Sequence, residues 1–289
     1  FSASKVKSCG RRPGPVLVDI ARDAQEALLS ESEIEREFHL PGYQPRRELN
    51  TEQLGRAAEE LAKAKRPVIY AGQGIILSGA EQALLAFAEK TGIPVTLTVL
   101  GLGAFPASHP LCLNMLGMHG HAWANFAVDE ADLVIALGAR FDDRVTGNAK
   151  EFAKNARIIH VDVDPSEINK NKPVHIPVAG DVREALEWLL PRVKKLSLKA
   201  WLDRIAFLRK RFPTTYDNAG DKIRPQFVLE KLSELTRGKA ILTTGVGQHQ
   251  MWAAQFYAVE KTRSFITSGG AGTMGFGLPS AIGAALGRP

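Results

Sequence analysis

The sequence predicts an α/β protein built around a parallel sheet. Two observations predict it: short β-branched runs alternate with helical patterns, and the length and apolar content suit folded domains. The chain has 289 residues, of which 45% are hydrophobic and 24% charged. At roughly 150 residues per domain, it can form about two domain cores. This composition excludes a disordered chain.

The elements are expected in the following order. A strand at 15–20 precedes a charged linker at 21–49, and Asn50 is expected to cap the next helix. Ser78 and Glu81 form a capping-box pattern before another helix. The remaining expected strands lie at 67–71, 94–98, 132–137, 157–163, 175–179 and 240–244, and the remaining helices at 181–195, at 199–211 and from Pro225 onward.

The chain is expected to contain one complete domain at 50–211. Residues 1–49 and 212–289 flank it and are expected to be parts of two further domains. Residues 212–224 are rich in turn formers and predict a linker. The sequence shows no internal repeat and no low-complexity tract.

Charge and cysteine content exclude several function classes. The net charge is +6, but the basic residues are scattered and form no stripe interleaved with aromatics, so no nucleic-acid partner is expected. Cys9 and Cys112 are too few for a disulfide scaffold and are expected to be packing residues in a reducing compartment. Residues 91–128 and 264–287 carry no charge, but prolines and glycines interrupt them, so no membrane span is expected.

Glycine, arginine and aspartate gather where the expected strands end. Because ligands bind at the carboxyl ends of parallel strands, these residues indicate a dinucleotide across the sheet edge. Glycine allows close backbone approach, arginine pairs with phosphate, and carboxylates accept ribose hydroxyls. The alternative is that they are ordinary turn residues, since the sequence has no GxGxxG motif.

Two further features invite a ligand. His119 and His121 lie in an uncharged stretch; a metal site there lacks acidic or cysteine partners, and the favoured interpretation is an apolar pocket-lining loop. In that interpretation His119 offers a hydrogen bond and Met118 is a core residue. Glycine clusters at 245–251 and 268–275 each precede an expected helix, a position suited to phosphate.

Six segments of the sequence carry a family resemblance: RPGPVLVDI (12–20), MLGMHG (115–120), GARFDDRVTG (138–147), HVDVDPSEINKNK (160–172), GVGQHQMWAAQFY (245–257) and SGGAGTMGFGLPSAIGAALG (268–287). At these segments the sequence resembles the catalytic subunit of acetohydroxyacid synthase (acetolactate synthase), a thiamine-diphosphate-dependent enzyme family. The resemblance implies a Rossmann-like, FAD-binding central domain at 50–211. It also implies the end of an N-terminal pyrimidine-type domain at 1–49 and the start of a C-terminal diphosphate-type domain at 212–289.

The resemblance also implies the residues that bind each cofactor. Those implied for FAD are Arg12, Gly72, Gly74, Thr98, Val99, Leu100, Leu116, Gly117, Met118, His119, Gly138, Ala139, Arg140, Asp142, Arg144, Val145, Asp162, Val163, Gly180, Asp181, Gln250, Met251, Gly269 and Gly270. Those implied for thiamine diphosphate are Val246, Gly247, Gln248, His249, Gly272 and Met274.

The implied reaction decarboxylates pyruvate and ligates its two-carbon unit to a second 2-keto acid, pyruvate or 2-ketobutyrate. Arg144 is implied to orient the carboxylate of that second acid, with Met118 and Gln248 as further catalytic residues; the structural alternative for Arg144 is an ion pair with Asp142 or Asp143. The family's activating glutamate and its Mg²⁺ motif match no residue of the sequence, so no metal ligand is assigned. This stretch alone is therefore expected to lack synthase activity.

The family also implies partners and a compartment. It implies a homodimer or tetramer, a possible regulatory subunit, and a cytoplasmic location in bacteria or a plastid or mitochondrial one in eukaryotes. Two alternatives stay open: a flavin-dependent thiamine-diphosphate oxidoreductase such as pyruvate oxidase, and a non-catalytic nucleotide-binding module. The segment RFDDRVTG favours the synthase over the oxidase.

Overall fold

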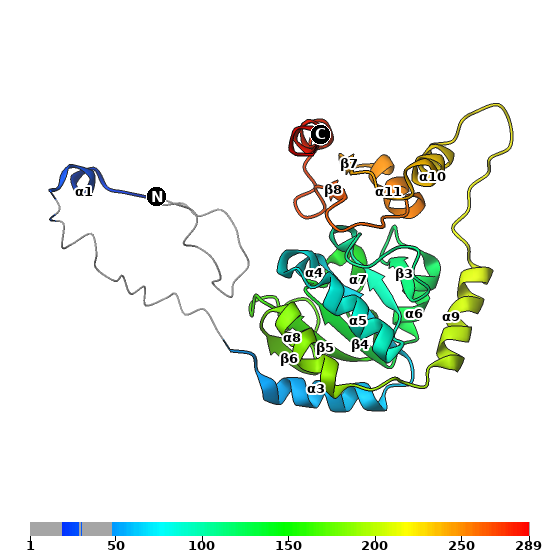
Figure 1. Cartoon of the computed structure of the whole chain (residues 1–289), viewed down its shortest axis with the longest axis horizontal. Helices are drawn as coiled ribbons and strands as arrows, with labels where there is room; N and C mark the ends of the chain where they lie inside the picture. The colour runs from blue at the N-terminus through cyan, green and yellow to red at the C-terminus, as the bar shows by residue number, and fades with distance from the viewer. Residues whose placement is uncertain (1–18, 29, 31–47, 289) are drawn as a thin grey trace.

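A parallel sheet of six strands forms the centre of the molecule, in the order β3-β2-β1-β4-β5-β6. The structure is a computed structural model that describes residues 19–28, 30 and 48–288 (Figure 1). The strands are Pro67–Ala71 (β1), Val95–Leu97 (β2), Cys112–Met115 (β3), Leu133–Leu137 (β4), Arg157–Asp162 (β5) and Ile176–Ala179 (β6). In this doubly wound order the chain changes direction across the sheet between β1 and β4. The predicted α/β class is confirmed.

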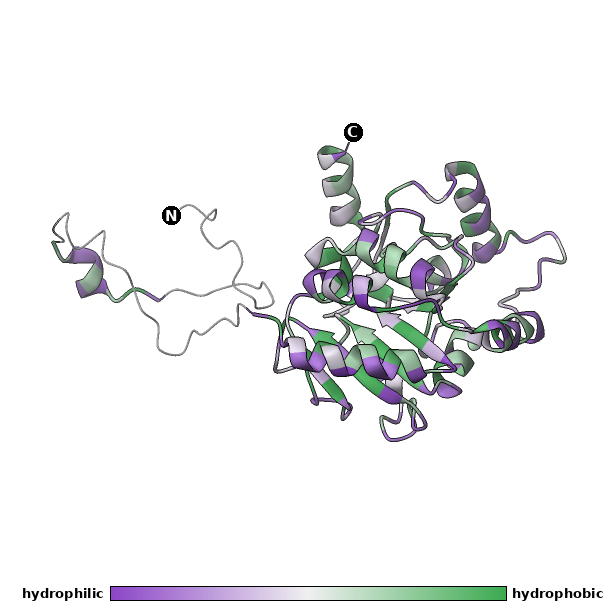
Figure 2. Ribbon diagram, turned by 60° about the horizontal axis from the view of Figure 1, so that its bottom comes forward, coloured by the Kyte–Doolittle hydropathy of each residue, from purple (hydrophilic) through white to green (hydrophobic). Residues whose placement is uncertain are grey.

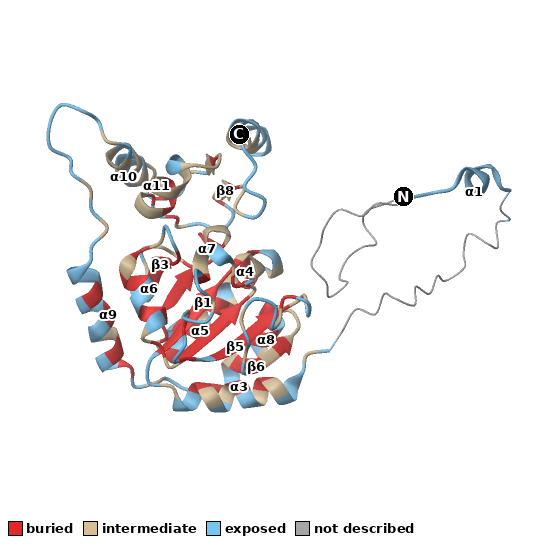
Figure 3. Cartoon of the chain, turned by 180° about the vertical axis from the view of Figure 1, so that it is seen from behind, coloured by how far each residue is buried: buried red, intermediate tan, exposed pale blue. Residues whose placement is uncertain are grey.

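The central strands are buried along their whole length. Every residue of β1 and β4 is buried, and the strands are the most uniformly buried elements in Figure 3. A strand covered on both faces needs apolar side chains on both, and Figure 2 shows these strands in the hydrophobic colour. This explains why the short β-branched runs that predicted these strands show no alternation of apolar and polar residues.

Seven helices belong with this sheet among the described residues. They are Thr51–Lys63 (α3), Gln73–Ser78 (α4), Glu81–Thr91 (α5), Ala122–Asp129 (α6), Asp143–Thr146 (α7), Val182–Leu189 (α8) and Lys199–Arg211 (α9). As predicted, Asn50 caps α3: its side-chain oxygen accepts a hydrogen bond from the Gln53 N–H at 3.0 Å. The indole of Trp201 ties α9 to the sheet by donating to the Pro67 carbonyl at 3.0 Å.

The predicted capping box at Ser78 is wrong. Ser78 is the last residue of α4, and its hydroxyl donates to the Gly74 carbonyl at 2.8 Å. Gly79 ends that helix in the left-handed conformation, with φ 66°. The following helix α5 has Ala80 at its N-cap and no side-chain cap.

Three other expectations also need correction. The expected linker at 21–49 contains an exposed helix, Arg22–Glu26 (α1), and residues 31–47 of it lie outside the described residues. The expectations for 91–128 omitted two elements, β3 and α6, which flank the loop at 116–121. The helix expected at 181–195 ends at Leu189 and continues as a short 3-10 turn containing Pro191, which cannot extend an α-helix.

The last part of the described chain forms a smaller unit. Residues 212–224 contain no helix or strand, and Pro225 begins the next helix, both as predicted. The elements that follow are Pro225–Thr236 (α10), Leu242–Thr244 (β7), Gln248–Phe256 (α11), Phe265–Thr267 (β8) and Gly277–Gly287 (α12). Strands β7 and β8 pair in parallel, and Figure 1 shows them beyond the carboxyl ends of the larger sheet.

Side-chain contacts hold this unit against the larger sheet. The Glu260 carboxylate accepts from the Ser108 hydroxyl at 2.9 Å, and Arg263 donates to the Ile76 carbonyl at 2.8 Å. No helix in the described part of the chain combines the length and apolar character that crossing a bilayer requires.

Candidate functional site

The predicted site residues lie where strands end. Arg12 cannot be compared, because residues 1–18 lie outside the described residues. The same holds for residues 15–18 of the strand expected at 15–20, and its last two residues, Asp19 and Ile20, are not in a strand. The others lie at the ends of β1 (Gly72, Gly74), β2 (Thr98 to Leu100), β3 (Leu116 to His119), β4 (Gly138 to Val145), β5 (Asp162, its last residue, and Val163), β6 (Gly180, Asp181), β7 (Val246 to Met251) and β8 (Gly269 to Met274). Because the six strands of the larger sheet are parallel, their carboxyl ends share one edge, which gathers the first six of these segments. The last two belong to the separate two-stranded sheet.

Glycines let two backbone loops touch between β1 and β4, at the point where the strand order reverses. A Cβ added at Gly72 would lie 2.2 Å from the Gly138 carbonyl oxygen, and one at Gly74 would lie 2.5 Å from the Gly138 Cα. The Gly74 N–H donates to the Gly138 carbonyl at 3.1 Å. These glycines therefore close the two loops against each other, and the N–H of Gly74 is already engaged.

The loop after β4 presents two arginines beside carboxylates. Asp142 caps α7 by accepting from the Arg144 N–H at 3.0 Å, and it also pairs with Arg140. Partial burial opposes ionisation of Asp142, but that hydrogen bond and the charges of Arg140 and Arg144 hold its pKa below the usual range. The Arg144 side chain is 71% exposed, and its guanidinium lies 3.4 Å from the Asp143 carboxylate. Such an exposed pair is weak, so Arg144 can exchange this partner for an anionic ligand.

The loop after β3 is joined to this arginine loop through the backbone. The Met118 N–H donates to the Arg144 carbonyl at 2.8 Å, and a Cβ at Gly117 would lie 2.8 Å from that same oxygen. The Asn125 side chain makes two hydrogen bonds to the Gly117 backbone: its Nδ2 donates to the Gly117 carbonyl, and its Oδ1 accepts from the Gly117 N–H. Met118 is 62% exposed, so the expectation that it is a core residue is wrong. Its side chain instead stands at the same edge as Arg144.

The aspartates at the carboxyl ends of β5 and β6 already have structural partners. One oxygen of Asp162 accepts from the Asp164 N–H at 2.9 Å. Asp181 caps α8 by accepting from the N–H groups of Arg183 and Glu184. A Cβ at Gly180 would lie 2.5 Å from the Leu49 side chain, so this glycine serves packing. The turn-residue interpretation therefore accounts for part of the strand-end pattern.

The two glycine clusters of the C-terminal unit meet at the ends of β7 and β8. The hydroxyl of Thr267 lies 2.7 Å from that of Thr244 and accepts from Gln250 at 2.7 Å. A Cβ at Gly270 or Gly272 would have no atom within 4 Å, so both present open backbone. Met274 is 85% exposed.

The second cluster also touches the larger sheet. A Cβ at Gly269 would lie 2.9 Å from the side chains of Val99 and Leu100. The Gln255 amide donates to the His119 carbonyl at 2.8 Å, from α11 to the loop after β3. The loop after β8 therefore contacts the segment after β2 through residues implied for FAD, and Gly272 and Met274, implied for thiamine diphosphate, follow in the same loop.

The histidines of the uncharged stretch behave differently from each other. His119 is exposed, and its backbone carbonyl accepts the hydrogen bond from the Gln255 amide. His121 is buried, stacks on Trp123 with ring centroids 4.2 Å apart, and shares a 2.8 Å hydrogen bond with Thr214. Burial lowers the pKa of His121 to about 4, so the ring is neutral at pH 7. Within the described residues, no three His, Cys, Asp or Glu side chains lie close enough to hold a metal ion.

Sequence reasoning missed the residues that hold the site loops in place. Asn125 fixes Gly117, Gln255 fixes His119, and Asn171 donates to the Arg140 carbonyl at 3.0 Å. Their partners are backbone atoms, 8 residues away for Asn125, 31 for Asn171 and 136 for Gln255, so no motif spacing could have revealed them.

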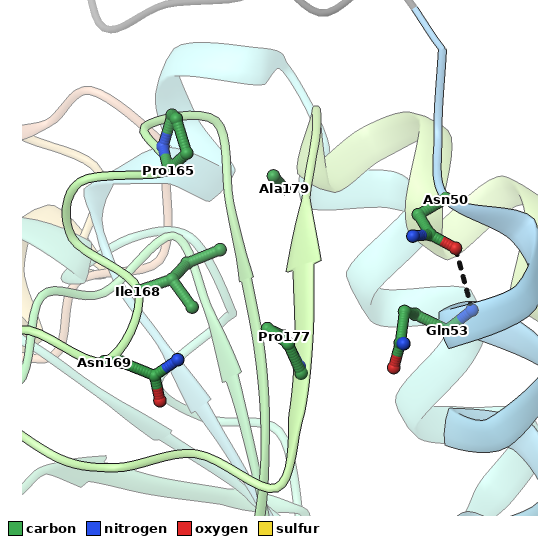
Figure 4. A pocket seen from close by; sticks show the side chains of 7 residues that line it. All are labelled: Asn50, Gln53, Pro165, Ile168, Asn169, Pro177 and Ala179. Atoms are coloured by element: carbon green, nitrogen blue, oxygen red, sulfur yellow. Dashed lines mark hydrogen bonds between the residues drawn. The ribbon is translucent and has the colours of Figure 1, made fainter.

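A separate small pocket of about 250 Å³ lies beside the outer strand β6 (Figure 4). The amides of Asn50, Gln53 and Asn169 and the apolar side chains of Pro165, Ile168, Pro177 and Ala179 line it. None of the predicted site residues is among them. The pocket is therefore distinct from the carboxyl-edge site.

Comparison with known proteins assigns the chain to a family. Residues 54–189 match the thiamine pyrophosphate enzyme central domain, and residues 245–289 match the thiamine pyrophosphate enzyme C-terminal TPP binding domain. Together the two matches cover well over half of the chain. The protein belongs to the thiamine pyrophosphate enzymes.

Its relatives narrow the resemblance further. The chain is 47% identical to "Acetolactate synthase 2, chloroplastic" of Nicotiana tabacum, over 96% of this chain and 43% of that protein. It is 48% identical to "Acetolactate synthase large subunit" of Corynebacterium glutamicum, over 96% of this chain and 45% of that one. The chain thus spans less than half the length of the curated relatives it matches. The predicted resemblance to acetolactate synthase catalytic subunits is confirmed.

Proposed function

We propose that the protein is the catalytic chain of an acetolactate synthase, which joins the two-carbon unit of pyruvate to a second 2-keto acid. The observation that carries the proposal is that the loop after β8, which holds residues implied for both cofactors, contacts the segment after β2, at Gly269 with Val99 and Leu100. Acetolactate synthases from a plant and a bacterium, similar over 96% of this chain, support it. The acceptor is pyruvate or 2-ketobutyrate.

Thiamine diphosphate fits the ends of β7 and β8. The open backbone at Gly272 allows close approach of a ligand, and the N-terminus of the nine-residue helix α11, where Gln248 and His249 are exposed, favours an anion. Val246, Gly247 and Met274 complete the proposed set. When bound, the cofactor supplies an electron sink for the decarboxylation of a 2-keto acid. Mg²⁺ is proposed as its companion, with no ligand assigned in this chain.

FAD fits the edge of the larger sheet. The exposed guanidinium groups of Arg140 and Arg144 supply positive charge for a pyrophosphate, and Gly270 supplies open backbone. The remaining FAD residues are those assigned above to the ends of the strands. Carboligation involves no net redox change, so the flavin is proposed to have a structural role.

Three side chains are proposed to act on the substrates. Arg144 would hold the carboxylate of the second keto acid in a bidentate pair, replacing its long contact with Asp143. Met118 would pack against the reacting groups, and its exposure at the same edge leaves it free to do so. Gln248, at the start of α11, would face the thiamine cofactor.

The assembly and compartment follow the family. A homodimer or tetramer with a possible regulatory subunit is proposed, in the cytoplasm of a bacterium or in the plastid or mitochondrion of a eukaryote.

Flavin retention tests the proposal. Purified chain is mixed with FAD, passed through gel filtration, and its visible absorption spectrum is compared with that of Arg144→Ala. Arg183→Ala is the matched control, since Arg183 is also exposed beside a carboxylate but lies on α8. The expected result is retained flavin in the parent and the control, and at least about tenfold less in Arg144→Ala, as loss of a charge-assisted pair predicts. Equal retention by all three would contradict the proposed site.

A further inference from the structure

Phe141 lies at the centre of the arginine loop in a conformation that large side chains avoid. Its φ is 52°, in the left-handed region, yet its side chain is 1% exposed. A bulky residue at positive φ is unfavourable and persists only where surrounding packing fixes it. The reversal of the backbone turns the Phe141 ring into the core, while its neighbours Arg140 and Asp142 stay nearer the surface.

Strands in register supply two of the rings that pack around Phe141, and Phe152 supplies a third, with its ring centroid 6.1 Å away. Tyr70 of β1 pairs with Ala136 of β4, and Ala136 pairs with His160 of β5. The Phe141 ring contacts both outer members of this row, with centroids 5.6 Å from Tyr70 and 5.1 Å from His160. The small side chain of Ala136 lies between these two members in the row.

His160 is an unusual packing partner for the Phe141 ring, because it is a buried polar side chain. It is fully buried, and neither ring nitrogen has a hydrogen-bond partner among the described residues. Its Nε2 lies 3.8 Å from the carboxylate of Asp162, and its ring is nearly perpendicular to that of Phe141, at 86°. The ring contact of this imidazole therefore joins the loop after β4 to strand β5.

We infer that Phe141 is a positioning residue that holds the Arg140–Arg144 loop at the carboxyl edge of the sheet. It does so because its ring packs between the rings of Tyr70 and His160, an arrangement called the clasp below. The significance of that loop for cofactor and substrate rests on the proposed function. The clasp itself rests only on the geometry of the loop and the strands.

Trypsin tests the clasp in the full 289-residue chain, because the loop carries its own cleavage sites after Arg140 and Arg144. The reference site follows Arg183 on α8, where cleavage requires that helix to open. In Phe141→Ala, cleavage at the loop sites relative to Arg183 is expected to rise at least about tenfold, since loss of a buried ring lowers the cost of local opening. Phe141→Leu, which keeps an apolar side chain, is expected to restore most of the protection.

Two further variants separate anchoring from general destabilisation. Phe87 is also fully buried but lies on α5, so Phe87→Ala is expected to raise cleavage at all three sites alike. Phe141→Gly removes the strain of positive φ together with the ring, and it is expected to open the loop as Phe141→Ala does. An unchanged cleavage ratio in both Phe141→Ala and Phe141→Gly would overturn the inference.

The contribution of His160 is tested by a double-variant cycle. If the two rings act as one clasp, His160→Ala opens the loop, and adding Phe141→Ala opens it little further. Fully multiplicative effects would contradict a shared clasp. Flavin retention by the same variants keeps the two proposals apart: a loosened loop with unchanged flavin retention would refute the flavin role of the loop and leave the clasp standing.

Discussion

The junction between β1 and β4 predicts a large effect from a very small substitution, Gly72→Ala. The added Cβ would lie 2.2 Å from the Gly138 carbonyl oxygen and 2.9 Å from the Ala139 Cα, so the two loops must separate by about 1 Å to reach ordinary contact. Overpacking of this kind costs about 1–3 kcal/mol. Separation also weakens the hydrogen bonds from Gly72 to Leu137 and from Gly74 to Gly138, each contributing about 1 kcal/mol. We expect the free energy of unfolding to fall by about 3 kcal/mol.

Urea unfolding followed by circular dichroism measures this change. Gly55→Ala is the matched control, because Gly55 lies inside helix α3 and an added Cβ would meet no atom within 4 Å. That substitution is expected to stabilise the protein by about 0.5–1 kcal/mol, since alanine is the better helix former. The same chemical change should thus have opposite signs at the two positions. Equal stability of Gly72→Ala and the parent would refute the close approach of the two loops.

Two other predictions concern buried titratable groups. Burial lowers the pKa of His121 to about 4 in the folded chain, from 6.5, so the unfolded chain binds the proton more readily and stability is lost as pH falls from about 6.5 toward 4. The free energy of unfolding is expected to fall by about 3 kcal/mol over this pH range. In His121→Phe the free energy of unfolding, measured in urea at a series of pH values, should change less between pH 6.5 and 4. The same pH dependence in the variant and the parent would contradict the prediction. Burial also raises the pKa of the Cys112 thiol to about 11, so in a Cys9→Ser background it should resist iodoacetamide at pH 8 and react only in urea. Rapid alkylation of the folded chain would show that Cys112 is accessible.

The sequence predicted the buried strands well because a strand buried on both faces is a continuous apolar run in the sequence. Strands β1 and β4 are continuous apolar runs, and residues at their ends could be assigned to one edge once the strands were taken as parallel. Strand β3 has no such continuous apolar run. It is a short edge strand without β-branched residues, and Asn114 within it has φ 60°.

Tertiary contacts overrode the local signals elsewhere. Ser78 and Glu81 have the spacing of a capping box, but Gly79 between them ends the preceding helix. Met118 is apolar and was expected in the core, but the turn at Gly117 and the bond of the Met118 N–H to Arg144 hold it at the surface. The clasp of Phe141 depends on a register across three strands, which no local pattern encodes.

The proposed FAD site spans the carboxyl edge of the six-stranded sheet, and a crystal structure of the chain grown with FAD tests that position. Flavin density is expected over the ends of β1 and β4, with the pyrophosphate near Arg140 or Arg144 and the two loops still closed at Gly72 and Gly138. Flavin density elsewhere, for example in the pocket beside β6, with none along that edge would contradict it.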